Sequence, residues 1–106
     1  MKILDLSLTY HWYDEIESGR KKEEYRQLKR FYYKRLLDFS SDVCIDNLIN
    51  AQSFAHYDAV RFHRGQGGKT TMLFKIEDIR IGYGRPDWGA PDNEKVFIIQ
   101  LGDKIK

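Results

Sequence analysis

The sequence predicts an α+β fold in which a small, strongly curved sheet or β-barrel is covered by helices. Three observations support this prediction. Several segments alternate apolar and polar residues with a period of two, which is typical of half-buried strands. Other segments carry apolar residues at helical spacing. The chain has only 106 residues, and five or six strands in so short a chain favour a sheet that curves on itself.

The N-terminal elements follow from these patterns. Ile3–Thr9 alternates, with three leucines on one side, and is predicted to be a strand. His11–Ser18 has apolar residues four positions apart, which indicates a short helix. Gly19 is expected to end that helix in the left-handed conformation that glycine adopts easily. Lys21–Leu28 alternates again and is predicted to be a strand with one very polar face.

Two further helices are predicted. The first is basic and amphipathic. Its apolar face carries Leu28, Phe31, Tyr32 and Leu36, and its opposite face carries Lys29, Arg30, Tyr33 and Lys34. The second covers Asp42–Ala51, with Ser41 or Asp42 as its capping residue.

The second half of the chain is predicted to be mainly β, with strands at Ala59–Arg64, Thr70–Ile81 and Lys95–Leu101. Residues 65–68 are a Gly-rich turn. The Gly-Lys-Thr-Thr that begins at Gly68 lacks the earlier glycine and the following helix of a phosphate-binding loop, so a hairpin is expected there. Residues 82–91 are predicted to be a loop, because glycine and proline interrupt both helix and strand.

The composition is that of a single folded domain over residues 1–106. Cys44 is the only cysteine, so no internal disulfide is expected, and no apolar leader follows Met1. These two features predict a cytoplasmic location. No apolar stretch approaches the length of a membrane span, so no membrane association is expected. A monomer is the expected state.

Positive charge is concentrated in one segment. Arg20–Arg35 contains eight Lys or Arg and only two acids, a local charge of +6 in a chain whose net charge is +2. A local basic face indicates a negatively charged partner. No metal and no other cofactor is expected, because the histidines and the cysteine have no metal-ligand spacing; they are His11, His56, His63 and Cys44.

One motif lies where the first helix runs into the second strand. Gly19, Lys21, Glu24 and Arg26 form a G-x-K-x-x-E-x-R pattern, which resembles the mark of the ASCH domain, a branch of the PUA-like β-barrels. The segments Val60-Arg61-Phe62 and Ile81-Gly82-Tyr83-Gly84 to Ile99 also look like one ASCH subgroup. The resemblance implies a small PUA-like β-barrel of five or six mostly antiparallel strands with two or three covering helices. It spans most of the chain apart from Asp38–Phe54, which looks like a lineage insertion.

The resemblance also implies a function. The family is thought to bind RNA or nucleotides in the cleft beside this motif. One branch of similar fold hydrolyses an N4-acylated cytidine with a threonine nucleophile, which its lysine activates. Glu24 stands at the position of that threonine, and a carboxylate cannot take over the role of the hydroxyl without a change of chemistry.

The candidate ligand-binding residues come from three segments. Lysine and arginine in the motif supply donors and positive charge for phosphate, and the glutamate can accept from a base amino group. The alternative is a solvated strand face with cross-strand ion pairs. The basic helix could track a phosphate backbone, and the 82–91 loop could either present rings for stacking or fold its tryptophan into the barrel as a plug. The candidates are Lys21, Glu24, Arg26, Lys29, Arg30, Tyr83, Arg85 and Trp88.

Three functions stay open at this point. The first is an RNA- or nucleotide-binding module. The second is a nucleobase- or RNA-processing hydrolase, amidohydrolase- or ribonuclease-like, in which Lys21 acts as base or electrostatic stabiliser and Glu24 as general acid or base. The third is a protein-interaction adaptor that presents the basic helix to an acidic partner.

Overall fold

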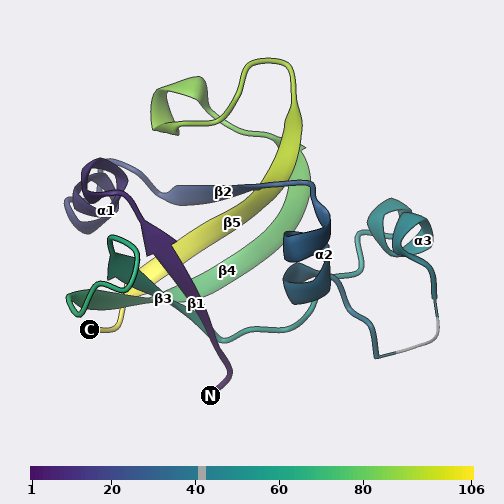
Figure 1. The fold of residues 1–106 in the computed structure, drawn as a ribbon, viewed down its shortest axis with the longest axis horizontal. Coiled ribbons are helices and arrows are strands. Elements are labelled where there is room, and N and C mark those ends of the chain that lie inside the picture. Colours follow the sequence, from purple (N-terminus) through teal and green to yellow (C-terminus); the bar gives the residue numbers. More distant parts are fainter. Residues whose placement is uncertain (41–42) are drawn as a thin grey trace.

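The structure is a computed structural model that describes residues 1–40 and 43–106. Within these residues, five strands form one mixed sheet that curves into a half-barrel, and three helices lie around it (Figure 1). The predicted α+β fold with a curved sheet and covering helices is therefore confirmed. In chain order the elements are β1 (Ile3–Leu8), α1 (Tyr10–Glu17), β2 (Glu23–Gln27), α2 (Arg30–Leu36), α3 (Ile45–Asn50), β3 (Ala59–Arg64), β4 (Thr71–Tyr83), the 3-10 turn η1 (Pro86–Trp88) and β5 (Lys95–Lys104).

The strands lie in the order β1-β3-β4-β5-β2. β1 and β3 are parallel, and the other three neighbouring pairs are antiparallel, as the prediction of mostly antiparallel strands requires. The long strand β4 changes register against β5 between Phe74 and Asp78. Such irregularities bend a strand and increase its twist, which helps the sheet to curve. β1 and β2 are thus the two edges of the sheet, although α1 alone separates them in the chain.

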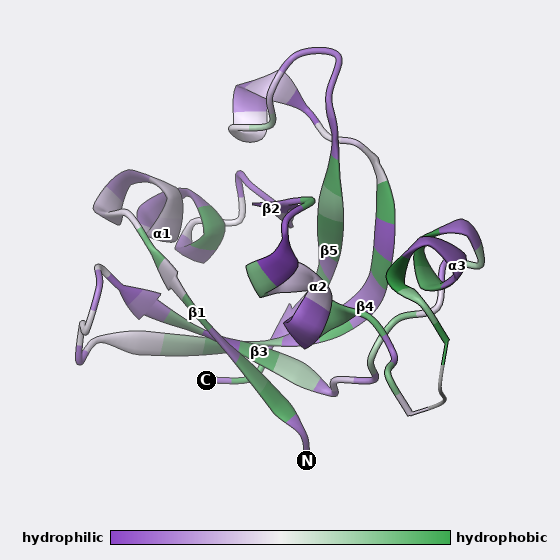
Figure 2. Cartoon of the chain, turned by 45° about the vertical axis from the view of Figure 1, so that its right-hand side comes forward, coloured by the Kyte–Doolittle hydropathy of each residue, from purple (hydrophilic) through white to green (hydrophobic). Residues whose placement is uncertain are grey.

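The core is formed by the inward-facing residues that the alternation predicts. Leu4, Leu6 and Leu8 of β1 are buried, as are Val60 and Phe62 of β3. From α1 the core receives the side chains of Tyr13 and Ile16. The apolar run in β5 appears as a green stretch in Figure 2, and α2 includes strongly hydrophilic residues, drawn in purple.

The predicted faces of α2 are partly wrong. Phe31 was assigned to the apolar face but is 56% exposed, whereas Tyr33, assigned to the polar face, packs edge-on against Phe97 at 5.9 Å between ring centroids. The helix begins only at Arg30, so Leu28 precedes it and cannot define its phase. Tyr33 faces the core together with Tyr32 and Leu36, which were assigned to the apolar face correctly, and this rotation turns Phe31 outward.

Two turns and one helix can be compared with their predictions. Gly19 follows the end of α1 with φ +85°, so the predicted left-handed residue is confirmed. The turn at residues 65–68 joins β3 to β4, so the predicted hairpin is confirmed as well. α3 is shorter than predicted, and Cys44 occupies its N-cap position without a side-chain cap hydrogen bond. The predicted caps Ser41 and Asp42 lie outside the described residues. In the described part of the chain, no helix has the length and apolar character that crossing a membrane requires.

A candidate ligand-binding cleft

The three charged side chains of the motif form a buried ion triad. Lys21 and Glu24 are 3% and 5% exposed. Lys21 Nζ lies 3.0 Å from Glu24 Oε1, and Arg26 Nη2 lies 2.6 Å from Glu24 Oε2, so each carboxylate oxygen binds one cation. The polar face of β2 therefore points into the molecule, and the alternative of a solvated strand face is wrong.

Both terminal nitrogens of Arg26 are engaged by neighbouring groups. Its Nη2 donates to Ser7 O at 2.9 Å, and its Nη1 donates to the hydroxyl of Tyr32 at 3.0 Å. Burial disfavours the charge of Arg26, but attraction to Glu24 and the hydrogen bonds to Tyr32 and Glu24 outweigh it and raise the pKa of the guanidinium. The guanidinium of Arg26 thus connects Glu24, Tyr32 and the backbone of Ser7 at the gap between β1 and β2.

Lys21 contacts two aromatic rings in addition to its ion pair with Glu24. Its Nζ is 4.2 Å from the centroid of the Trp12 ring and 5.6 Å from that of Tyr25. The tight turn at Gly19 makes this position possible, because the chain reverses there and places Lys21 beneath α1, where its backbone N–H bonds to Glu15 O. A cation over a ring face is attracted by the electrons of the ring, which adds to the ion pair with Glu24.

The cleft itself lies between α1 and the loop that contains η1. It has a volume of about 380 Å³ and is lined by Trp12, Glu15, Arg20, Lys21, Arg85, Asp87 and Trp88. The guanidinium of Arg85 stacks on Trp88 at 4.1 Å from the ring centroid and also forms two hydrogen bonds to Asp87, at 2.8 and 3.2 Å. A volume near this value is within the range of small-molecule sites.

Two contacts hold the loop against the rest of the cleft. The hydroxyl of Tyr25 accepts a hydrogen bond from Arg85 N at 3.0 Å and donates one to Glu23 at 2.8 Å. Gly89 has φ +97° and lies directly on Trp12, since a Cβ there would be 2.8 Å from Trp12 Cζ2. Only glycine fits this position without a shift of the loop or the indole.

The structure separates the candidate residues into two groups. Lys21, Arg85 and Trp88 line the cleft, and Glu24 lies behind Lys21 without lining it. Trp88 is half-buried and is not part of the core, which argues against the alternative of a barrel plug. Tyr83 is 65% exposed beside Lys95 and lies outside the cleft.

Lys29 and Arg30 lie on another surface, at the start of α2. With Lys34 and Arg35 they give this helix four basic side chains. Within residues 1–40 and 43–106, none of the four has a carboxylate oxygen within 4.0 Å. In the cleft, by contrast, each of the three cations has an acidic partner; the pairs are Arg20–Glu15, Lys21–Glu24 and Arg85–Asp87.

Sequence reasoning missed four residues of the cleft, namely Trp12, Glu15, Arg20 and Asp87. A signal for Trp12 was present, because it lies on the helix that leads directly into the motif. That Trp12 and Trp88 line the same cleft could not be predicted, since it depends on the docking of the loop between β4 and β5 on α1.

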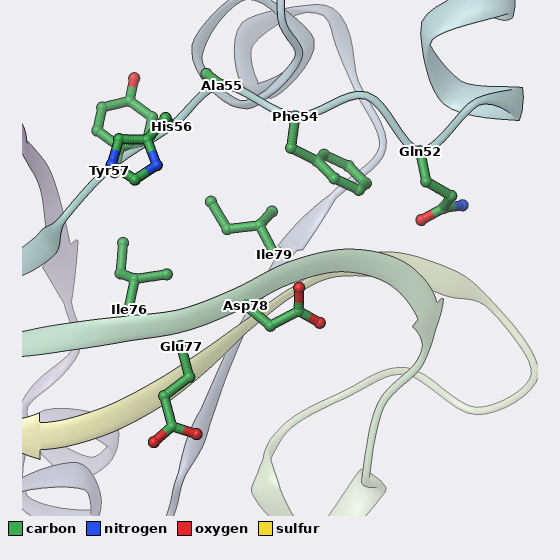
Figure 3. Close-up of a pocket in the computed structure, with 9 residues that line it drawn as sticks. All are labelled: Gln52, Phe54, Ala55, His56, Tyr57, Ile76, Glu77, Asp78 and Ile79. Carbon is green, nitrogen blue, oxygen red and sulfur yellow. The ribbon is translucent and has the colours of Figure 1, made fainter.

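A different depression, of about 340 Å³, lies between β4 and the segment that follows α3 (Figure 3). In the close-up, Ile76 and Ile79 point toward this segment, while Glu77 points away from it. The residues that line it include no lysine or arginine, so it offers little to an anionic ligand. Among the described residues, no group of three or more His, Cys, Asp or Glu is arranged to hold a metal ion.

Comparisons with protein-family models, with curated proteins and with solved structures each found no match. The resemblance to the ASCH domain therefore stays a prediction that rests on the residues quoted for it.

Proposed function

We propose that the chain is an RNA- or nucleotide-binding module and that the cleft beside Lys21 receives part of the ligand. The observation that carries this proposal is the meeting of Lys21, Trp12, Arg85 and Trp88 in one cleft. Cations attract phosphate, and flat rings stack on nucleobases. A cytoplasmic, monomeric protein is part of the proposal, and cell fractionation and analytical ultracentrifugation test those two points.

The cations of the cleft differ in how readily they can leave their carboxylate partners to bind a ligand. The two arginines of the pairs Arg20–Glu15 and Arg85–Asp87 are largely exposed, at 70% and 57%. Exposed ion pairs are weak, so either arginine can exchange its carboxylate for a phosphate at little cost. Lys21 is buried with Glu24 and supplies a fixed charge at the wall of the cleft.

The position of Glu24 favours binding over hydrolysis. Both of its carboxylate oxygens are bound by cations, and it does not line the cleft. A general acid or base must come within hydrogen-bond reach of the substrate proton. Hydrolysis with Lys21 and Glu24 remains the alternative function, and it requires Glu24 to leave both cations.

The tryptophans provide a direct test. The chain has two tryptophans, and both line the cleft. Titration with nucleosides, nucleotides and short RNAs should change the intrinsic fluorescence and raise the melting temperature, because a ligand that binds only the folded state stabilises it. Trp12→Phe and Trp88→Phe variants assign the signal to each ring.

Two variants complete this experiment. Arg85→Ala, which removes an exposed cation of the cleft, should weaken binding. Lys104→Ala removes an exposed lysine outside the cleft and should leave binding unchanged. If no nucleoside, nucleotide or RNA changes the fluorescence, the proposed function is contradicted. Binding of an acidic protein to α2 would instead favour the protein-interaction adaptor.

A further inference from the structure

We propose that the ligand is a single-stranded RNA that extends beyond the cleft, and that Phe31 and Arg35 on α2 hold a second nucleotide. This inference rests on the proposed function and names the ligand class more narrowly. It follows from a second depression, from an exposed ring, from unpaired charge and from the ion triad that joins the two places.

The second depression is not the one drawn in Figure 3; it lies between β1, α2 and the β3–β4 hairpin. It has a volume of about 260 Å³, and the residues that line it include Ser7, Arg26, Phe31, Tyr32, Arg35 and Gln66. Its floor is therefore formed by the same contact between Arg26 and β1 that bridges the edges of the sheet. Backbone, amide, hydroxyl and guanidinium groups around one ring are the groups that bind single-stranded nucleotides.

Phe31 is held in a position to stack. It is 56% exposed, although the adjacent Tyr32 and Tyr33 pack against the core. The ring contacts Tyr32 edge-on at 5.0 Å, and the guanidinium of Arg35 lies 5.4 Å from its centroid. A base that stacks on Phe31 would meet a ring already fixed by its neighbours, so little conformational freedom is lost on binding.

The charge of α2 is complementary to a polyanion. Lys29, Arg30, Lys34 and Arg35 have no carboxylate partner in the described part of the chain. Arg35 donates to the backbone oxygen of Asp5 at 3.1 Å, which leaves its charge uncompensated. Asp5 also lines this depression, but its carboxylate is bound to Arg61 and His63. Unpaired cations in a row attract successive phosphates and release their counterions on binding.

The cleft and the second depression are linked through one buried carboxylate. Lys21 lines the cleft and Arg26 lines the second depression, and both side chains bind the carboxylate of Glu24. A single side chain thus separates the cations of the two places. A single strand of several nucleotides can place one base near Trp88 and another base on Phe31, with phosphates over α2.

The test compares short and long ligands in the full chain. The probes are the four ribonucleoside 5′-monophosphates and single-stranded RNA of about eight nucleotides, within the range of sizes that single-strand binding folds cover. Phe31→Ala should weaken RNA binding by roughly 5- to 150-fold, the effect of losing one stacked base, and should leave mononucleotide affinity unchanged. Arg35→Gln should reduce the magnitude of the salt slope of RNA binding by about 0.7, the value for one phosphate of a single strand.

A matched control is Tyr10→Ala. Tyr10 is 61% exposed and stacks with Arg64 at 4.2 Å, but Arg64 is bound to Asp14 by two hydrogen bonds and is not free for phosphate. This variant should leave RNA affinity unchanged. Exposed positions make misfolding a minor concern, and circular dichroism checks it.

The outcomes separate the two proposals. Mononucleotides that bind as tightly as the RNA, with no effect of Phe31→Ala, would overturn the second site and leave the proposed function intact. Equal affinity for double-stranded RNA would overturn it too, because paired bases cannot stack on Phe31. A protein that binds neither mononucleotide nor RNA would contradict the proposed function itself.

Discussion

Arg26 on β2 donates a 2.9 Å hydrogen bond to the backbone oxygen of Ser7 on β1. These strands are the opposite edges of the sheet, so this side chain bridges a gap that backbone pairing leaves open. The same guanidinium binds Glu24, which binds Lys21 at the wall of the cleft. Closure of the half-barrel and placement of the cleft cation therefore depend on one buried ion triad.

Arg26→Met should destabilise the fold strongly. The change leaves Glu24 buried with one cation and removes the bridge to β1, and breaking a buried ion pair costs about 3–5 kcal/mol. Urea unfolding followed by circular dichroism measures it. The control is Arg61→Ala, whose partner Asp5 is 46% exposed, and it should cost no more than about 1 kcal/mol. Similar losses of unfolding free energy in both variants would show that the buried triad stabilises the fold no more than an exposed ion pair does.

Gly89→Ala should disturb the cleft more than Gly67→Ala does. Both glycines have positive φ, so alanine costs about 1–2 kcal/mol at either position. Only at Gly89 does the added Cβ approach Trp12, whereas at Gly67 it meets nothing within 4 Å. A shift in the emission maximum of tryptophan fluorescence and weaker ligand binding are expected for Gly89→Ala alone. Identical spectra and affinities in the two variants would contradict the close contact between the loop and Trp12.

Tyr25 should make the protein sensitive to alkali. Burial raises the pKa of its hydroxyl; the hydrogen bond from Arg85 N opposes this, and the bond to Glu23 adds to it. The folded state thus holds this proton more tightly than the unfolded chain. The resulting stability is fully present below pH about 10, the usual tyrosine pKa, and is lost as the pH rises above it.

Urea unfolding between pH 7 and 11 tests this effect. Tyr25→Phe should be less stable at pH 7 by about 1–2 kcal/mol, because it loses two hydrogen bonds, but its stability should fall less steeply above pH 10. Tyr83→Phe, at a 65% exposed position, should behave like the wild type. A decline in Tyr25→Phe as steep as that of the wild type would show that this hydroxyl does not carry the effect.

Lys21→Arg should separate a binding role from a proton-transfer role. Binding needs only the charge, so Lys21→Arg should keep most of the nucleotide affinity, while Lys21→Ala should lose about tenfold or more, the effect of a charged hydrogen bond. Proton transfer needs a titratable amine, which arginine does not provide. Isothermal titration calorimetry and turnover assays measure the two properties. A substrate that the wild type consumes, and that a folded Lys21→Arg variant binds but does not convert, would establish the hydrolase alternative.

The purified protein should not release acetate from N4-acetylcytidine. The resemblance to the ASCH domain implies that Glu24 stands where the acylcytidine-cleaving branch carries threonine. Its two carboxylate oxygens are bound by Lys21 and Arg26. Chromatography of the nucleoside after long incubation is the measurement. Rapid formation of cytidine would require another nucleophile or an activated water.

Much of the backbone could be predicted from local pattern. The alternation of Ile3–Thr9 and Ala59–Arg64 indicated both the strands and their buried residues, because a strand with one buried face needs an apolar residue at every second position. The same holds for the left-handed Gly19 and for the hairpin at residues 65–68, since each depends on a few neighbouring residues only.

The candidate site could be predicted only in part, because its geometry depends on contacts between distant segments. Alternation in Lys21–Leu28 could not show which face of β2 is buried, and the sheet order turned Glu24 inward, where two cations compensate its burial. The phase of α2, and with it the exposure of Phe31, was set by packing on Phe97 of β5. Trp12 and Trp88 line one cleft because the loop that carries Trp88 packs on Trp12 through Gly89. Local spacing determines which elements form; long-range packing and the compensation of buried charge decide which side chains meet.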